Sequence, residues 1–169
     1  MKVRALLLMG AIATGLVVSA GTAGARVQAQ ADITCNPGGS PACFGTPRHD
    51  TVIGSNKTDQ IFALGGPDFV DARGGSDAVF GGRGDDLPGR GGGLDGGAGD
   101  DDVFGQEGDD TVADGIGGDT DRLYGGAGND FVDGVDGDDR DFVDCGPGRD
   151  FFDADPGDFV NLSDCEIPF

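Results

Sequence analysis

The chain has 169 residues, with 35 glycines, 31 acidic residues against 11 basic ones, and a net charge of −20 at pH 7. Such a charge argues against binding to nucleic acid or anionic membrane surfaces, because both need Lys and Arg. Large apolar residues are scarce, so disorder is the simplest alternative to a fold. However, every acid except Glu107 and Glu166 is aspartate, whose short carboxylate stays close to the backbone. This bias favours ordered turns.

The first residues, 1–25, have the pattern of a secretory signal peptide, with basic residues, an apolar run and then small residues. Cleavage is expected after Ala25, with Ala29 and Ala31 as alternatives. The apolar run is too short and too rich in Gly and Ala to favour a permanent transmembrane helix. We therefore expect a secreted, extracellular protein without a membrane span, in which residues 26–44 form an N-terminal segment.

Four cysteines follow the signal pattern, and an even number in an exported chain indicates disulfides. Three pairings are open, and the local one, Cys35–Cys43 with Cys145–Cys165, is favoured because each pair encloses a short, turn-rich loop. A metal–thiolate site is the alternative, although neither spacing resembles a zinc site and His49 is the only histidine.

An internal repeat runs through the rest of the chain, in which an aspartate is followed two residues later by an apolar residue. Asp50 precedes Val52 and Asp59 precedes Ile61, and the next aspartates keep the nine-residue spacing. An apolar residue between two outward neighbours has the period of a β-strand. The aspartates in this register are Asp50, Asp59, Asp68, Asp77, Asp86, Asp95, Asp101, Asp110, Asp121, Asp130, Asp141, Asp150 and, weakly, Asp158.

The residues before these aspartates are glycine-rich, and segments 81–86, 96–101 and 125–130 read G-G-x-G-x-D. The repeat resembles the RTX, or haemolysin-type, calcium-binding nonapeptide G-G-x-G-x-D-x-U-x, where U is a large apolar residue. The resemblance extends from about Gly45 to Asn161, with three full copies in phase with partial ones. It implies an all-β fold, the right-handed parallel β-roll, that is largely unfolded without calcium.

The chemistry of the unit agrees with this resemblance. Glycine permits a tight turn that exposes backbone carbonyls, and aspartate adds a carboxylate, so the turn offers the hard oxygen ligands that suit Ca²⁺. Several ions would neutralise the carboxylates, and their binding free energy would become folding free energy. The expected metal-site residues are the aspartates above, except Asp158, with Gly81, Gly84, Gly96, Gly99, Gly108, Gly125, Gly128 and Gly148.

Each nonapeptide is expected to form one turn and one strand, so two complete a coil and equivalent turns stack eighteen residues apart. The spacing predicts two edges, with Asp59, Asp77 and Asp95 on one and Asp50, Asp68 and Asp86 on the other.

Two stretches depart from the repeat. Pro88 occupies an inward position that a central strand would not tolerate, and Asp95 to Asp101 spans only six residues, so a bulge, a loop or a lost strand is expected. Segments 114–121 and 134–141 each carry two extra residues, on the same edge if the coil alternates. Their extra aspartates either add ligands or lie in solvated loops, and the second interpretation is slightly favoured. Neither resembles an EF-hand.

The β-roll is expected over residues 45–161, followed by a C-terminal cap at 162–169. Cys145–Cys165 would hold this cap over the last coil, covering a sheet edge that would otherwise invite aggregation. Many RTX proteins leave the cell through an exporter that reads the C-terminus, but the N-terminal signal pattern does not support that route here.

Outward aromatic residues fall in pairs on neighbouring strands. Aromatic ladders that support a thin core are the favoured interpretation, and a binding surface for a partner is the alternative. The pairs are Phe62 with Phe80, Phe104 with Tyr124, Phe131 with Phe151, and Phe142 with Phe159.

Catalytic motifs are missing from the sequence: there is no G-x-S-x-G elbow, no H-E-x-x-H and no P-loop. His49 is expected in a solvated turn, and Asp100 and Asp101 lie inside a repeat turn. About twenty residues between the signal and the repeats leave no room for a catalytic domain. We therefore expect an exported calcium-binding β-roll and no enzyme; the alternatives are a calcium-dependent adhesion or cell-surface matrix protein and, least favoured, a hydrolase built on the solenoid.

Overall fold

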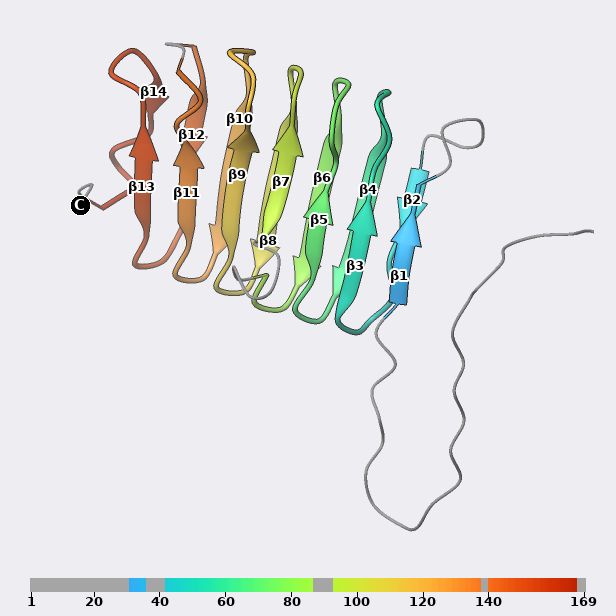
Figure 1. The fold of residues 1–169 in the computed structure, drawn as a ribbon. Helices are drawn as coiled ribbons and strands as arrows, with labels where there is room; N and C mark the ends of the chain where they lie inside the picture. The colour runs from blue at the N-terminus through green and yellow to red at the C-terminus, as the bar shows by residue number, and fades with distance from the viewer. Residues whose placement is uncertain (1–30, 36–41, 87–92, 138–139, 167–169) are drawn as a thin grey trace, which may run out of the picture.

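The computed structural model describes residues 31–35, 42–86, 93–137 and 140–166. Within these ranges the regular elements are fourteen β-strands, arranged as two seven-stranded sheets in which all neighbours pair in parallel. The chain alternates between the sheets and so winds as a flattened β-solenoid (Figure 1). The expected all-β parallel β-roll is confirmed. The signal-peptide prediction for residues 1–25 lies outside the described residues.

The odd-numbered strands form one sheet, here the odd sheet, whose spatial order follows the chain from one end of the solenoid to the other. It contains β1 (Ala31–Thr34), β3 (Asp50–Ile53), β5 (Phe69–Asp71), β7 (Leu94–Gly97), β9 (Thr111–Gly115), β11 (Phe131–Gly134) and β13 (Phe151–Ala154).

The even-numbered strands form the facing even sheet, in the same spatial order. It contains β2 (Ala42–Phe44), β4 (Gln60–Gly65), β6 (Ala78–Arg83), β8 (Asp102–Glu107), β10 (Arg122–Ala127), β12 (Phe142–Asp144) and β14 (Phe159–Val160). No helix in the described part of the chain is long and apolar enough to cross a membrane.

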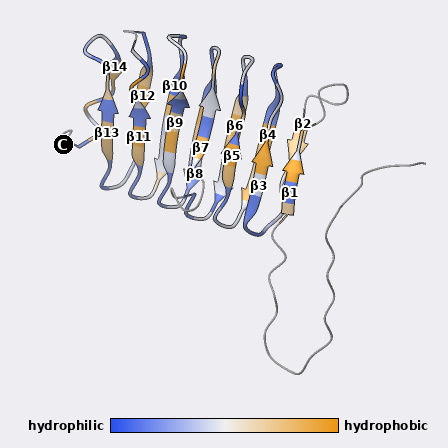
Figure 2. Cartoon of the chain, in the orientation of Figure 1, coloured by the Kyte–Doolittle hydropathy of each residue, from blue (hydrophilic) through white to orange (hydrophobic). Residues whose placement is uncertain are grey.

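The core lies between the sheets and consists mainly of one apolar side chain from each strand. This follows from the two-residue period of a strand, which turns the residue two positions after each repeat aspartate inward. Apolar residues follow the strands, whereas the turns at both edges are hydrophilic (Figure 2). The fully buried members of this row are Val52, Ile61, Val70, Val79, Leu94, Val103, Val112, Leu123, Val132 and Val143.

The irregular stretch after Asp86 shifts the register by six residues. Leu94 pairs with Val70 on one side and with Val112 on the other, so it takes the inward position that the repeat count assigned to Pro88. Leucine can fill the core and its backbone N–H is available to the sheet, which proline cannot provide. Residues 87–92, including Pro88, lie outside the described ranges.

The two longer turns lie on the same edge, as expected from the alternation. They follow β9 and β11, and the Gly118 backbone N–H in the first donates to the Asp136 carboxylate in the second. The longer turns therefore stack on each other as a matching pair.

The two disulfides are Cys35–Cys43 and Cys145–Cys165, which is the local pairing predicted from the sequence. The first links the end of β1 to β2, and the second links the residue after β12 to the segment after β14. All four cysteines are consumed, so the metal–thiolate alternative is wrong. The bridges hold the strands at the two ends of the solenoid.

Stacked aromatic rings run along the outer face of the even sheet. The predicted pairs Phe62–Phe80 and Phe104–Tyr124 have ring centroids 4.9 and 4.7 Å apart. Phe80 also stacks on Phe104 at 5.0 Å and Phe44 on Phe62 at 5.1 Å, so the pairs belong to one ladder. Because the rings cover one another, the ladder supports the favoured structural interpretation.

Glycine at the fourth motif position allows a close approach of successive coils. Gly108 has φ +140°, and a Cβ built on it would overlap the Gly84 carbonyl oxygen of the neighbouring coil. Gly137 also has positive φ, +103°, but a Cβ there would meet open space. We expect Gly108→Ala to lower the free energy of unfolding by about 3 kcal/mol or more and Gly137→Ala by about 1–2 kcal/mol.

Urea unfolding of both variants in saturating calcium measures this difference. Equal losses would show that backbone conformation alone, and not the approach of the coils, requires glycine at this position.

Candidate metal centre

Buried aspartates form a hydrogen-bonded ladder along each edge of the solenoid. The backbone N–H of each ladder aspartate except the last donates to one carboxylate oxygen of the aspartate in the next coil, with N···O distances of 2.6–3.1 Å. The odd-strand ladder is Asp50, Asp68, Asp86, Asp110, Asp130 and Asp150, which lie just before or at the start of the odd strands, except Asp86, which lies eight residues before β7. The even-strand ladder, before the even strands, is Asp59, Asp77, Asp101, Asp121, Asp141 and Asp158.

The ladders contain every predicted metal-site aspartate except Asp95. The Asp77 carboxylate is the acceptor for Asp59, as expected, but the next acceptor is Asp101 and not Asp95. Asp95 lies inside β7, beside Asp71. The expected place of Asp95 on the edge was wrong because the six-residue shift moves the next turn from eighteen to twenty-four residues away.

The second carboxylate oxygen of most ladder aspartates is buried and has no hydrogen-bond partner. A buried acceptor without a partner costs free energy, and a buried charge costs more. An ordered fold therefore needs either protons or cations at these oxygens. The unpartnered Oδ2 atoms of the ladders belong to Asp68, Asp77, Asp86, Asp101, Asp110, Asp130 and Asp150.

The raised pKa values of the ladder aspartates also indicate that their carboxylates need a proton or a cation. Burial is the largest cause that raises the pKa of Asp68 and Asp101 from 3.8 to about 8, and the neighbouring ladder carboxylates raise it further. The same causes raise the pKa of Asp86 and Asp130 to about 7. The backbone hydrogen bond to each carboxylate opposes these shifts without cancelling them. At neutral pH, the hydrogen bonds of the ladders therefore do not offset the cost of burying the charged carboxylates.

Glycine at the first motif position leaves space beside the unpartnered oxygen. A Cβ on Gly81 would lie 2.5 Å from Asp86 Oδ2, and one on Gly125 would lie 2.8 Å from Asp130 Oδ2. Gly105, which the sequence analysis did not assign, has the same relation to Asp110 Oδ2 at 2.6 Å. Its position five residues before a ladder aspartate was the available signal.

The remaining predicted glycines lie in the strand ends and turns next to the ladders. Gly96 would place a Cβ 2.8 Å from the Oδ2 atom of Asp101. Gly148 forms a bridge to Gly128 in the neighbouring coil. The fourth-position glycines with positive φ are Gly84, Gly99, Gly108 and Gly128.

A further acidic cluster lies beside the longer turns. Asp114, Asp121 and Asp136 each have a carboxylate oxygen within 4.8 Å of the others. From the sequence, Asp114 and Asp136 could be recognised only as extra aspartates of these turns. Their approach depends on how the two turns stack.

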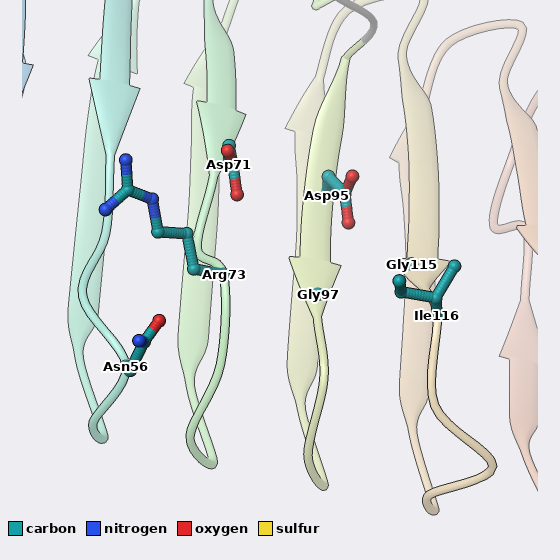
Figure 3. Close-up of a pocket in the computed structure, with 7 residues that line it drawn as sticks. All are labelled: Asn56, Asp71, Arg73, Asp95, Gly97, Gly115 and Ile116. Carbon is teal, nitrogen blue, oxygen red and sulfur yellow. The ribbon is translucent and has the colours of Figure 1, made fainter.

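A groove of about 430 Å³ crosses the odd sheet and is lined in part by Asp71, Asp95, Arg73 and Ile116. Asp71 and Asp95 lie on neighbouring strands, whereas the Arg73 side chain extends away from both carboxylates (Figure 3). Burial, and then the charge of Asp71, raise the pKa of Asp95. Asp95 therefore belongs to this outer pair and not to the ladders.

The geometry defines the class of protein. Oxygen-only donors, buried carboxylates without partners and glycine-formed spaces fit a hard cation with flexible coordination, which is Ca²⁺. The fold and the site are those of a calcium-binding repeat solenoid.

The family model of the RTX calcium-binding nonapeptide repeat matches four copies, at residues 53–88, 94–112 and 117–141. The repeats of this chain therefore belong to the RTX, or haemolysin-type, family and bind Ca²⁺. No curated protein and no solved structure shows a significant match to the chain.

The raised pKa values predict how calcium binding responds to pH. Unfolded aspartates titrate near pH 3.9, whereas folded-state values of about 6 to 8 mean that the ion-free fold retains protons that the unfolded chain has released. The stability of the ion-free fold therefore decreases as pH rises from about 4 to 8. Calcium replaces these protons, so its affinity should increase between pH 5.5 and 8.

Calorimetric titrations in buffers with different ionisation enthalpies measure both the affinity and the number of protons released. An affinity that is constant over this pH range, without proton release, would contradict the assignment of these carboxylates as ligands.

Proposed function

We propose that the protein is an exported module whose folding and rigidity depend on Ca²⁺ ions held between its stacked turns. The observation that carries the proposal is the repeated, buried Oδ2 atom without a partner on both edges. A cation shared by successive turns would supply each of these oxygens with a partner and would neutralise adjacent carboxylates.

The proposed ligands are the aspartates of the two ladders apart from Asp50, Asp59 and Asp158, together with backbone oxygens of the glycine turns between them. The Oδ2 atoms of these three aspartates already accept hydrogen bonds from backbone N–H groups within their own turns. On the odd-strand edge, the turns with glycines at both the first and fourth positions are 81–86, 105–110 and 125–130. On the even-strand edge the corresponding turn is 96–101. These four turns combine the unpartnered carboxylate oxygen with the space that glycine leaves beside it.

A coupling between calcium and folding follows from the small size of the core. Each strand contributes mainly one inward side chain, often valine, while the chain carries 35 glycines and a net charge of −20. Glycine loses much backbone freedom on folding, and like charges oppose compaction. The free energy of cation binding to the folded form would offset these costs, because the unfolded chain lacks the assembled sites.

Export is the second part of the proposal, and it is supported by the signal pattern of residues 1–25 and by the two disulfides. Strand β1 begins at Ala31, which pairs with Asp50. Cleavage after Ala25 or Ala29 would leave this strand intact, whereas cleavage after Ala31 would remove its first residue. We propose one of the two earlier positions.

We further propose that the calcium-binding repeats of the β-roll span residues 45–161. Strands β1 and β2, which continue the two sheets at the N-terminal end, and the disulfide-linked segment after β14 would act as caps. The role is binding or structural and not catalytic. His49 is exposed in the turn before β3, and the paired acids Asp100 and Asp101 belong to a ladder turn.

Removal of calcium tests the proposal. We expect the oxidised protein to gain strand signal in circular dichroism as Ca²⁺ is added to the millimolar range, and to lose it on chelation at pH 8. Calorimetry should give several ions per chain. Equal strand content after exhaustive chelation would overturn the coupling between calcium and folding.

Removing the charge of a single ladder carboxylate should lower the affinity for calcium. Asp110→Asn keeps an oxygen acceptor for the Asp86 backbone N–H but removes the charge, so we expect calcium affinity at the adjoining sites to decrease by about 10-fold or more. The matched control is Asp153→Asn on exposed strand β13, which should bind calcium as the wild type does. Equal affinity in both variants would remove Asp110 from the ligand set.

A further inference from the structure

Asp114 is the one charged residue at a position that the solenoid otherwise fills with small side chains, among the residues that the structure describes. It lies in β9, two residues after the inward Val112, and only 2% of it is exposed. Its Oδ2 atom is buried without a hydrogen-bond partner. The equivalent residues of other strands are Cys35, Gly45, Gly54, Ala63, Ala72, Gly81, Gly96, Gly105, Gly125, Gly134, Cys145 and Ala154, and the exception is Leu162 after the last strand, which is large but uncharged.

Two more carboxylates from different elements meet Asp114. Asp121 comes from the even-strand ladder and is 3% exposed, and Asp136 comes from the longer turn of the next coil. One oxygen of each lies within 4.8 Å of the others. Oxygens that bind one Ca²⁺ at about 2.3–2.6 Å are at most about 5 Å apart. The three oxygens can therefore share an ion.

We propose that Asp114, Asp121 and Asp136 form a Ca²⁺ site additional to those of the repeat pattern, which shares Asp121 with the even-strand ladder. The site goes beyond the proposed function because Asp114 and Asp136 belong to neither ladder, and Asp114 replaces the first-position glycine of its turn. Three carboxylates at one point form a hard, strongly negative ligand set, which suits Ca²⁺.

The surroundings of Asp114 make its negative charge unfavourable unless a cation is bound. Burial raises its pKa to about 8, and the charged groups that raise it further are all carboxylates, those of Asp136, Asp121, Asp141 and Asp133. A cation at this point would offset the repulsion between these carboxylates.

The site would connect the two longer turns. The Gly118 backbone N–H of the first turn donates to Asp136 Oδ2, so the two turns already meet beside the three carboxylates. An ion shared with Asp114 and Asp121 would join β9, the start of β10 and the turn after β11. The extra residues would thus become a connection between coils.

Calcium stoichiometry of the oxidised, exported protein tests the site, with Ca²⁺ as the probe. We expect Asp114→Asn to bind one ion fewer than the wild type, or to weaken one site by about 10-fold or more. Its calcium-dependent strand signal should remain, because the ladders are unchanged. The matched control, Asp153→Asn, removes an exposed carboxylate from β13 and should retain the wild-type stoichiometry.

Asp136→Asn provides a second variant whose change lies in a half-exposed turn, so it tests the site even if a change at buried Asp114 prevents folding. It should lose the same ion. Wild-type stoichiometry and affinity in both variants would overturn this site and leave the proposed function intact. A wild-type protein that takes up no calcium would overturn both.

Discussion

The burial of carboxylates beside a thin core is the constraint on which the rest of the structure depends. Most ladder aspartates use one oxygen to accept a hydrogen bond from the backbone of the neighbouring coil, and their other oxygen is buried without a partner. The first interaction determines the spacing of the coils, and the second requires a cation or a proton. Structure and calcium binding therefore arise from the same side chain.

The other features of the fold limit the cost of this arrangement. Glycine permits coils to approach so closely that a Cβ on Gly108 would overlap the next carbonyl oxygen. The aromatic ladder covers part of the outer face of the even sheet, and a disulfide holds each end. None of these features neutralises the buried charge. They hold the coils in the arrangement in which a bound cation can neutralise it.

Much of the fold and site could be predicted because the repeat is a local signal. The spacing of Asp50, Asp68 and Asp86 identified one edge correctly, and the Asp-x-U unit identified the inward row of residues. Glycine at fixed distances before each aspartate identified the turns. This local pattern is sufficient to predict which residues are neighbours when every coil has the same length, since equivalent residues of successive coils are then a fixed number of positions apart.

The sequence by itself therefore determined the period, the two edges, the type of cation and the local cysteine pairs. Tertiary structure alone decided which residues meet where the coil length changes. It placed Leu94 in the core, moved the ladder from Asp95 to Asp101 and continued the aromatic stack from Phe80 to Phe104. It also brought Asp114 and Asp136 together. The reason is that pairing across a sheet depends on which residue can fill the core and donate to the next strand, and counting along the chain does not contain that information.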